Sequence, residues 1–208
     1  MPDRDALLLF LATGLALNLT PGPDMLYVAA RSASEGRAAG VASALGIAAG
    51  TLVHIALVAC GLAALLAAVP VAYTIVRLAG AAYLVYLGVR ALWRPSAMTE
   101  RVLAPASRWA VFRQGVVTNV LNPKVALFFL AFLPQFVDPA RGSPALQVLA
   151  LGLLFDTSGT IVNLAVALGA SGAAGRLRRS ARAAQLLERA TGALFVALGV
   201  RLALAGRR

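Results

Sequence analysis

Charged side chains inside apolar segments are the residues of this sequence best placed to do chemistry. Asp156 follows the apolar run 149–155 and has no basic residue within several positions. A charge in a bilayer costs about 2.5–3.5 kcal/mol on insertion scales, so it is retained for a function or a partner. A carboxylate there predicts a site for a substrate ammonium group or a coupled proton. A structural ion pair with Lys124 or Arg77 is the alternative.

The single histidine, His54, also lies within an apolar segment, at a position that matches Asn163 in the second half of the chain. A histidine at membrane depth can relay protons near neutral pH. A neutral imidazole that hydrogen-bonds a neighbouring helix explains it equally well. Both interpretations stay open on the sequence.

Two proline-containing breaks interrupt apolar segments, one from Thr20 to Asp24 and one from Asn119 to Lys124. Proline cannot donate a backbone hydrogen bond, and glycine adopts torsions that other residues avoid. Each break predicts a half-helix, beginning near Met25 or Val125, whose free N–H groups attract a carboxylate. The alternative is an ordinary helix start with a lysine that snorkels to the interface. The candidate substrate-binding and coupling residues are Asn18, Thr20, Pro21, Gly22, Pro23, Asp24, His54, Asn119, Asn122, Pro123, Lys124 and Asp156.

Asparagine, arginine, glycine and proline residues of the first half recur in the same order in the second half, at an offset of 101 to 112 positions. Such internal similarity in an apolar chain is typical of transporters built from repeats. The matched pairs include Gly14 and Gly115, Asn18 and Asn119, Pro21 and Pro123, Gly50 and Gly159, Thr51 and Thr160, Arg77 and Arg189, Gly80 and Gly192, and Gly88 and Gly199.

Composition places these elements in a membrane. Of 208 residues, 60% are hydrophobic and 13% charged, which is more apolar side chain than a soluble domain of this size buries. We expect an all-α membrane protein of six transmembrane helices, arranged as a 3+3 inverted repeat in which helices 1 and 4 are broken. The single domain 1–208 comprises repeat 1 (about 5–93), a cytoplasmic linker (about 94–110) and repeat 2 (about 111–205). The predicted spans are about 5–30, 39–68, 71–93, 111–137, 145–169 and 186–205.

The loop charges predict an orientation. The first, third and fifth loops carry net charges of +1, +4 and +4, and the other two carry none. The positive-inside rule therefore makes the first, third and fifth loops cytoplasmic and puts both termini outside. Arg201, Arg207 and Arg208 argue the other way, which keeps a five-span or re-entrant arrangement open. Because the arginines that give the net charge of +11 lie between spans, we expect no nucleic-acid partner.

Several function classes are excluded by what the sequence lacks. One cysteine, Cys60, and one histidine do not make a metal cage or a disulfide framework. The sequence has no nucleophile elbow, phosphate-binding loop or zinc-binding histidine pair. We therefore expect a protein that is not an enzyme and holds no cofactor, in which any uphill transport is driven by an ion gradient.

The chain carries five further motifs: Thr20–Asp24, Gly46-x-x-x-Gly50, the 80–88 stretch, Phe112–Lys124 and Phe128-Phe129. These motifs resemble those of the LysE/RhtB translocators, bacterial inner-membrane exporters of amino acids such as lysine, homoserine, threonine or leucine. The resemblance covers nearly the whole chain. It implies a multi-pass protein of the bacterial inner membrane that exports a small amino acid or derivative, in exchange for protons. Asp156 falls where that family carries an acidic residue.

On this hypothesis the half-helix starts and Lys124 receive the substrate carboxylate, while Asp24 or Asp156 receives the ammonium group. Asn18, Asn119 and Asn122 orient both groups. Six short spans are compatible with a homodimer. Two alternatives stay open: an exporter of another small solute or cation on the same scaffold, and a non-transporting membrane adaptor whose loops recruit partners.

Overall fold

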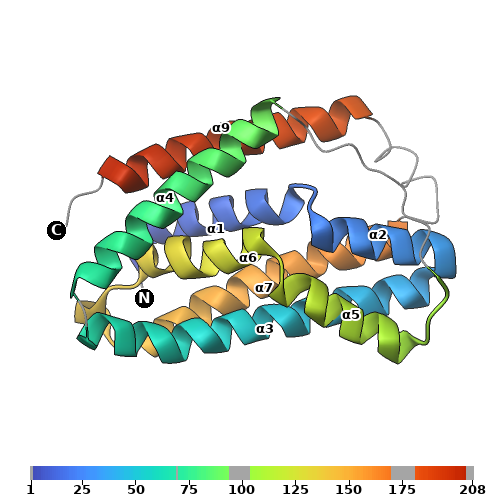
Figure 1. Cartoon of the computed structure of the whole chain (residues 1–208), viewed down its shortest axis with the longest axis horizontal. Coiled ribbons are helices and arrows are strands. Elements are labelled where there is room, and N and C mark those ends of the chain that lie inside the picture. The colour runs from blue at the N-terminus through green and yellow to red at the C-terminus, as the bar shows by residue number, and fades with distance from the viewer. Residues whose placement is uncertain (1, 69, 94–103, 170–180, 205–208) are drawn as a thin grey trace.

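The computed structural model describes residues 2–68, 70–93, 104–169 and 181–204, and those residues form helices without any strand (Figure 1). Most of the predicted linker, and Arg207 and Arg208, lie outside them. The first half comprises α1 (Arg4–Leu19), α2 (Pro23–Glu35), α3 (Arg37–Ala68) and α4 (Pro70–Trp93). The second half comprises α5 (Arg108–Val120), α6 (Pro123–Leu127), η1 (Phe128–Phe132), η2 (Leu133–Phe136), η3 (Pro139–Arg141), α7 (Pro144–Gly169) and α9 (Ala181–Leu204).

Both predicted helix breaks are present. The axis bends by 46° between α1 and α2, and by 47° between α5 and the segment Pro123–Phe136. At the first break Gly22 is fully extended and makes no side-chain cap, and at the second the Asn122 side chain accepts a hydrogen bond from the Lys124 N–H group. The half-helices begin at Pro23 and Pro123, two residues earlier than predicted, because proline fits the first helical position where no N–H partner is needed.

Over the residues that the structure describes, this membrane protein is all-α and has two to four candidate spans. The Arg37–Gly61 segment of α3 and the whole of α7 are each long and apolar enough to cross a bilayer. Each bent pair adds one more candidate if its two parts count as a single span. The last predicted spans of the two halves correspond to α4 and α9, which are not among these candidates. Six crossings and the 3+3 inverted repeat therefore remain predictions.

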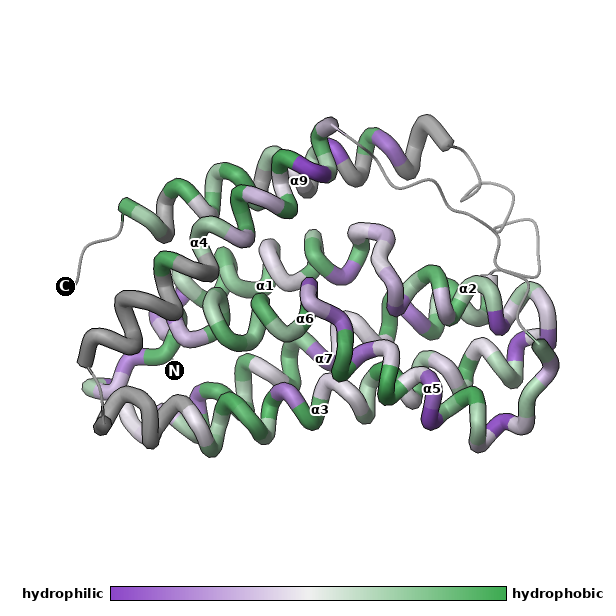
Figure 2. Tube along the Cα trace, viewed as in Figure 1, coloured by the Kyte–Doolittle hydropathy of each residue, from purple (hydrophilic) through white to green (hydrophobic). Residues whose placement is uncertain are grey.

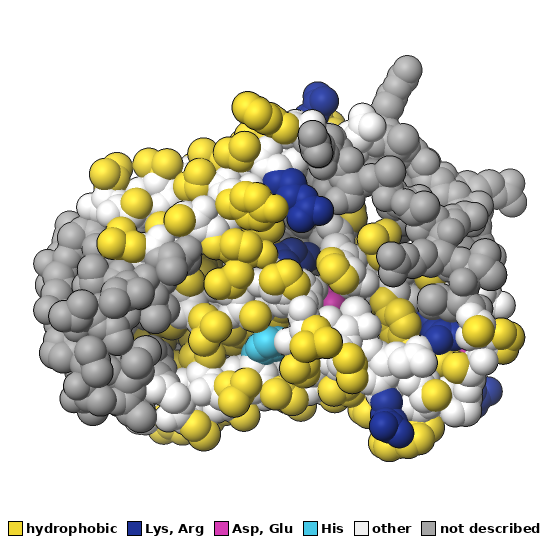
Figure 3. Space-filling view, in the orientation of Figure 1, with side chains coloured by type: hydrophobic (Ala, Val, Ile, Leu, Met, Phe, Trp, Pro, Cys, Tyr) yellow, Lys and Arg dark blue, Asp and Glu magenta, His cyan; other side chains and the backbone are white. Residues whose placement is uncertain are grey.

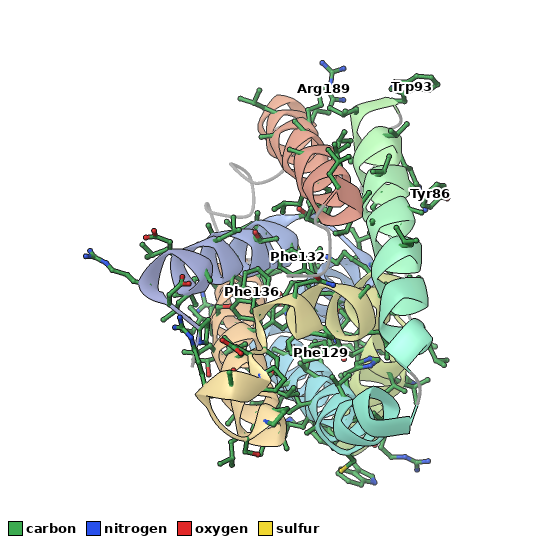
Figure 4. All side chains as sticks on the ribbon, turned by 90° about the vertical axis from the view of Figure 1, so that its left-hand side faces the viewer. Tyr86, Trp93, Phe129, Phe132, Phe136 and Arg189 are labelled. Carbon is green, nitrogen blue, oxygen red and sulfur yellow. The ribbon has the colours of Figure 1, made fainter. Side chains whose placement is uncertain are left out.

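The helices form two groups. α3 packs against α2, α5 and α7, whereas α4 and α9 lie side by side and pack mainly on each other (Figure 1). Apolar residues run along most helices, and hydrophobic side chains cover much of the face seen in Figure 3 (Figures 2 and 3). On α4, Tyr86 is 55% and Trp93 82% exposed, and both point away from the other helices (Figure 4). Such an apolar exterior suits a lipid environment.

Residues matched in the predicted repeat make reciprocal contacts. A Cβ atom on Gly50 of α3 would lie 2.7 Å from Cβ of Asn119 on α5, and one on Gly159 of α7 would lie 3.0 Å from Oδ1 of Asn18 on α1. Gly50 matches Gly159 in the repeat, and Asn18 matches Asn119. The same glycine–asparagine contact therefore occurs twice, once with the glycine in the first half and once with the glycine in the second half. Elements related by a twofold axis contact each other in this way.

The pair α4–α9 follows the same pattern. A Cβ atom on Gly88 would lie 2.5 Å from the Gly192 carbonyl oxygen, and one on Gly199 would lie 2.8 Å from the Ala81 carbonyl oxygen. Gly88 matches Gly199 in the sequence, and Ala81 directly follows the counterpart of Gly192. Glycine at these positions lets the two backbones approach closely, as it does in many membrane helix pairs.

A cluster of phenylalanine rings fills the core on one side of the breaks. The rings of Phe128 and Phe155 stack with centroids 4.3 Å apart, which packs η1 against α7. Phe129, Phe132 and Phe136 project from η1 and η2 into the space between the helices (Figure 4). The cluster comprises Phe10, Phe128, Phe129, Phe132, Phe136 and Phe155.

Candidate functional site

Lys124 joins the two breaks. Its Nζ atom donates hydrogen bonds to the carbonyl oxygens of Leu17 and Thr20, each at 3.1 Å. The last carbonyls of a helix lack their usual partners, and at the end of α1 the lysine of the second break adds donors to the 3.2 Å bond that the Thr20 N–H group makes to the Leu17 carbonyl oxygen. A Cβ atom on Gly22 would lie 3.0 Å from Nζ, so this glycine leaves room for the lysine. The snorkelling alternative for Lys124 is therefore wrong.

Asp24 lies beside this lysine. Its side chain is buried, with 8% of the residue exposed, and Oδ2 accepts a hydrogen bond of 3.0 Å from Nδ2 of Asn119. The carboxylate also lies close to Lys124, Asn122 and His54. Neither Oδ1 of Asp24 nor Nδ2 of Asn122 has a hydrogen-bond partner. Asp24 is in neither of the ion pairs that the described residues form, so its attraction to Lys124 acts without direct contact.

Asn119 connects three elements around the second break. Besides its bond to Asp24 on α2, its Oδ1 lies 3.4 Å from Oγ1 of Thr51 on α3, and its backbone oxygen lies 3.2 Å from Nε2 of His54. The imidazole also stacks on the ring of Phe129 with centroids 5.8 Å apart. His54 therefore bonds a neighbouring helix, which was the second of its two interpretations.

Asn18 plays the corresponding part at the first break. Its Nδ2 donates to the Phe155 carbonyl oxygen at 3.2 Å and to Oγ of Ser158 at 2.9 Å. These bonds tie the C-terminal end of α1 to α7, just as Asn119 ties α5 to α3. Two asparagines matched in sequence thus hold the two broken helices against the two long helices.

Asp156 projects from α7 and is half-buried. Thr51 of α3 lies close to its carboxylate. Asp156 is in neither ion pair of the described residues, and Lys124, its suggested structural partner, is bound to carbonyl oxygens instead. The side chain of Arg77, the other suggested partner, is outside the described residues.

A small polar cavity lies where these groups meet. Its volume is about 20 Å³, room for about one water molecule. Four of the predicted site residues line it, and they come from α1, α2, α5 and α7. The lining residues are Asn18, Asp24, Ile47, Thr51, Asn119, Val125, Phe155, Asp156, Gly159, Thr160 and Asn163.

The other predicted site residues build the breaks rather than the cavity wall. The hydroxyl of Thr20 donates to the Ala16 carbonyl oxygen at 2.7 Å, and Asn122 caps the start of α6. His54 backs Asn119. Those that do not line the cavity are Thr20, Pro21, Gly22, Pro23, His54, Asn122, Pro123 and Lys124.

Three polar lining residues are absent from the predicted site: Thr51, Thr160 and Asn163. A signal for them exists in the sequence, because Thr51 and Thr160 are matched in the repeat and Asn163 is matched with His54.

The helix starts also change one match of the repeat. Pro23 and Pro123, rather than Pro21 and Pro123, occupy the first position of their half-helices. Asp24 and Lys124 are then the second residues of α2 and α6. The two equivalent positions carry opposite charges, and each charge attracts the other across the interface between the halves.

Comparison with known proteins agrees with the motif resemblance. An uncharacterized membrane protein of Pseudomonas aeruginosa is 39% identical over 194 residues, which are 90% of this chain and 89% of that protein. The homoserine/homoserine lactone efflux protein of Salmonella typhimurium is 32% identical over 198 residues, 93% of this chain and 94% of that protein. The leucine efflux protein of Salmonella choleraesuis is 34% identical over 134 residues, 62% of each chain.

No solved structure matches the chain significantly. The family model of the LysE type translocators matches residues 15–206, which include both breaks and every residue that lines the cavity. The chain therefore belongs to the LysE type translocator family.

Proposed function

We propose that this protein exports a small amino acid or amino-acid derivative across the bacterial inner membrane, in exchange for protons. The observation that carries the proposal is the polar cavity between the two helix breaks, which holds two carboxylates inside an otherwise apolar membrane protein. Ionisable groups at membrane depth mark substrate and ion pathways. Relatives named as homoserine/homoserine lactone and leucine efflux proteins support the direction and the substrate class.

The two halves act as an inverted repeat that alternates between two packings. The reciprocal contacts Gly50–Asn119 and Asn18–Gly159 support this arrangement, and the cavity lies between the elements that they join. A repeat of this kind has two similar packings, each open to one side of the membrane. The cavity as it stands holds about one water molecule, so it corresponds to a closed state that must widen to admit substrate.

The cavity wall suits an ammonium group. Asp24 and Asp156 supply the charge, and Oδ1 of Asp24 has no partner of its own. The amides and hydroxyls of the remaining polar lining residues supply hydrogen bonds to the rest of the substrate. Lys124 donates hydrogen bonds to the end of α1 at the first break, and its charge offsets that of Asp24.

The charges of the site support the proposed exchange for protons. Asp24 and Lys124 offset each other, and Asp156 has no cation among the described residues that line the cavity. One negative charge thus remains, and leaving it uncompensated in a closed membrane site is costly. When the substrate ammonium leaves, a proton on Asp156 restores the balance, which couples export to proton entry.

Efflux from cells that express the protein tests this proposal. Cells loaded with a dipeptide as an intracellular source of amino acid are transferred to fresh medium, and the released amino compounds are measured. We expect faster release with the wild type and loss of that release with Asp156→Asn. Asp5→Asn, a change of the same kind on an exposed residue of α1, serves as the control. Wild-type release no faster than from cells without the protein would contradict the export function.

A further inference from the structure

We propose that Thr51 is a positioning residue of the site. Its hydroxyl holds Asp156 ready for the substrate ammonium group, and it passes its hydrogen bond to Asn119 once the charge of Asp156 is neutralised. This role rests on the proposed export function and adds to the same cavity a residue that acts through Asp156. It is carried by the contacts of the Thr51 hydroxyl and by the small size of the cavity.

The Thr51 hydroxyl faces acceptors from three helices. Thr51 lies on α3, is 3% exposed and lines the cavity. Its Oγ1 atom lies 3.2 Å from the Ile47 carbonyl oxygen and 3.4 Å from Oδ1 of Asn119 on α5. The carboxylate of Asp156 on α7 is close as well, and both residues line a cavity with room for about one water molecule.

These acceptors compete, because a hydroxyl group has one hydrogen to donate. The oxygens of Ile47 and Asn119 are neutral, whereas the carboxylate of Asp156 is charged when ionised. A hydrogen bond to an ionised acceptor is about twice as strong as one between neutral groups. Thr51 therefore donates to Asp156 while that carboxylate is ionised, and turns to a neutral acceptor when a proton or an ammonium group neutralises it.

A hydroxyl suits this place better than a cation would. A lysine or arginine beside Asp156 would compete with the substrate ammonium group for the carboxylate. A hydroxyl donor favours the ionised carboxylate without a charge of its own. Its oxygen also has lone pairs that can accept a hydrogen bond from the same ammonium group. Thr51 thus keeps Asp156 ionised and still open to a cation.

Asn119 receives the hydrogen bond that Asp156 gives up. Its Nδ2 atom donates to Oδ2 of Asp24 at 3.0 Å, which turns Oδ1 toward Thr51. A Cβ atom on Gly50 would lie 2.7 Å from Cβ of Asn119, so α3 and α5 are in close contact at this point. Neutralising Asp156 therefore adds a bond between α3 and α5, two helices from different halves of the chain, and ionising it removes that bond.

The other charged and titratable groups around the cavity lie against Asp24. Asp24 lines the cavity from α2, and His54 of α3 and Lys124 of α6 are close to its carboxylate. From α1, the described lining residue is the neutral Asn18. Replacing the Thr51 hydroxyl therefore alters the surroundings of Asp156 without adding or removing a charge.

Exchange of labelled for unlabelled amino acid across proteoliposomes tests the inference, with purified full-length protein and the same pH on both sides. Leucine and homoserine, which appear in the names of two relatives, are the probes, each below its half-saturation concentration. Protons and the substrate ammonium group compete for Asp156, so exchange falls as the pH is lowered. Without the hydroxyl the ionised carboxylate loses a donor, and protons compete more effectively. We expect Thr51→Val to raise the pH of half-maximal exchange by about one unit, and Thr51→Ser to keep the wild-type value.

Thr13→Val is the matched control. Thr13 of α1 is 1% exposed and donates to the Leu9 carbonyl oxygen at 2.7 Å, but it does not line the cavity, so we expect no shift. An unchanged midpoint in Thr51→Val, a shift that Thr51→Ser also shows, or an equal shift in Thr13→Val would overturn the inference and leave the export function standing. If the wild type exchanges neither probe faster than protein-free liposomes, the export function fails and the inference fails with it. Thr51→Ala, which removes the same hydroxyl, takes the place of Thr51→Val should that variant not fold, with the same expected shift.

Discussion

The two asparagines of the site differ in the charge of the groups that accept their hydrogen bonds. Asn119 donates to the buried carboxylate of Asp24, whereas Asn18 donates to a carbonyl oxygen and a hydroxyl. The two residues are matched in the sequence and occupy equivalent places at the ends of α1 and α5. Hydrogen bonds to charged groups contribute about 1.5–3 kcal/mol, against about 0.5–1.5 kcal/mol for neutral ones.

Replacing each asparagine by alanine measures this difference. Asn119→Ala leaves Oδ2 of Asp24 buried without its donor, so we expect a loss of about 2–3 kcal/mol of stability. Asn18→Ala removes bonds between neutral groups, and we expect about 1 kcal/mol. Unfolding of the detergent-solubilised variants by denaturant gives both values. Equal losses would mean that Asn119 does not stabilise the ionised carboxylate.

At the scale of the elements, a second set of polar bonds fastens α2 to α5. Arg31, 3% exposed, forms an ion pair with Glu35 and donates to Oε1 of Gln114 at 2.6 Å and to the Ala104 carbonyl oxygen at 2.9 Å. The Tyr27 ring lies 5.7 Å from its guanidinium carbon. These bonds join α2 to α5 and to the Ala104 backbone that precedes α5.

The contribution of this cluster can be compared with that of an exposed pair. Removing one partner of a buried ion pair costs about 3–5 kcal/mol, because the other charge stays buried. We expect Arg31→Ala to lose about that much stability, since it also frees Gln114 and the Ala104 carbonyl. The matched control is Arg141→Ala, whose pair with Asp138 has side chains 49% and 46% exposed and should contribute about 0–1 kcal/mol. The shift in thermal unfolding of the two variants checks this, and similar shifts would contradict it.

The breaks and the central polar residues could be predicted from the sequence, because proline, glycine and buried charge act locally. Pro23 and Pro123 must start a helix or interrupt one, and Asp156 stands out in an apolar run. The partner of Lys124 could not be predicted in the same way. Its acceptors are backbone carbonyls more than a hundred positions away, and every residue has such a carbonyl.

The cavity wall was only half predictable for a related reason. Thr51 and Thr160 are neutral and common in membrane helices, so their type alone does not mark a site. Thr51 lies on α3 and Thr160 on α7. Their part in the site is visible only in the structure, where the bends place α2 and α5 against these two helices. Residues that act through their position in three dimensions carry a weak local signal.

On the proposed function, the whole molecule is a pair of related halves around one closed site. The halves meet through matched asparagines and glycines, and their half-helix starts carry Asp24 and Lys124 at equivalent positions. Asp156 breaks the symmetry, since no cation among the described residues that line the cavity offsets its charge. The central claim is that this charge is neutralised in turn by a substrate ammonium group and by a proton.

Simultaneous measurement of substrate and proton movement tests that claim most directly. Proteoliposomes that contain the purified protein are loaded with alaninamide and a pH-sensitive dye and diluted into amine-free buffer, with the membrane potential clamped by potassium and valinomycin. Liposomes without protein correct for passive diffusion of the uncharged amine. We predict protein-dependent acidification of the interior with one proton entering for each amine that leaves, at a rate independent of the clamped potential, and loss of both movements in Asp156→Asn. Amine exit without proton entry, or proton-coupled exit that persists in Asp156→Asn, would show that Asp156 does not couple the two movements.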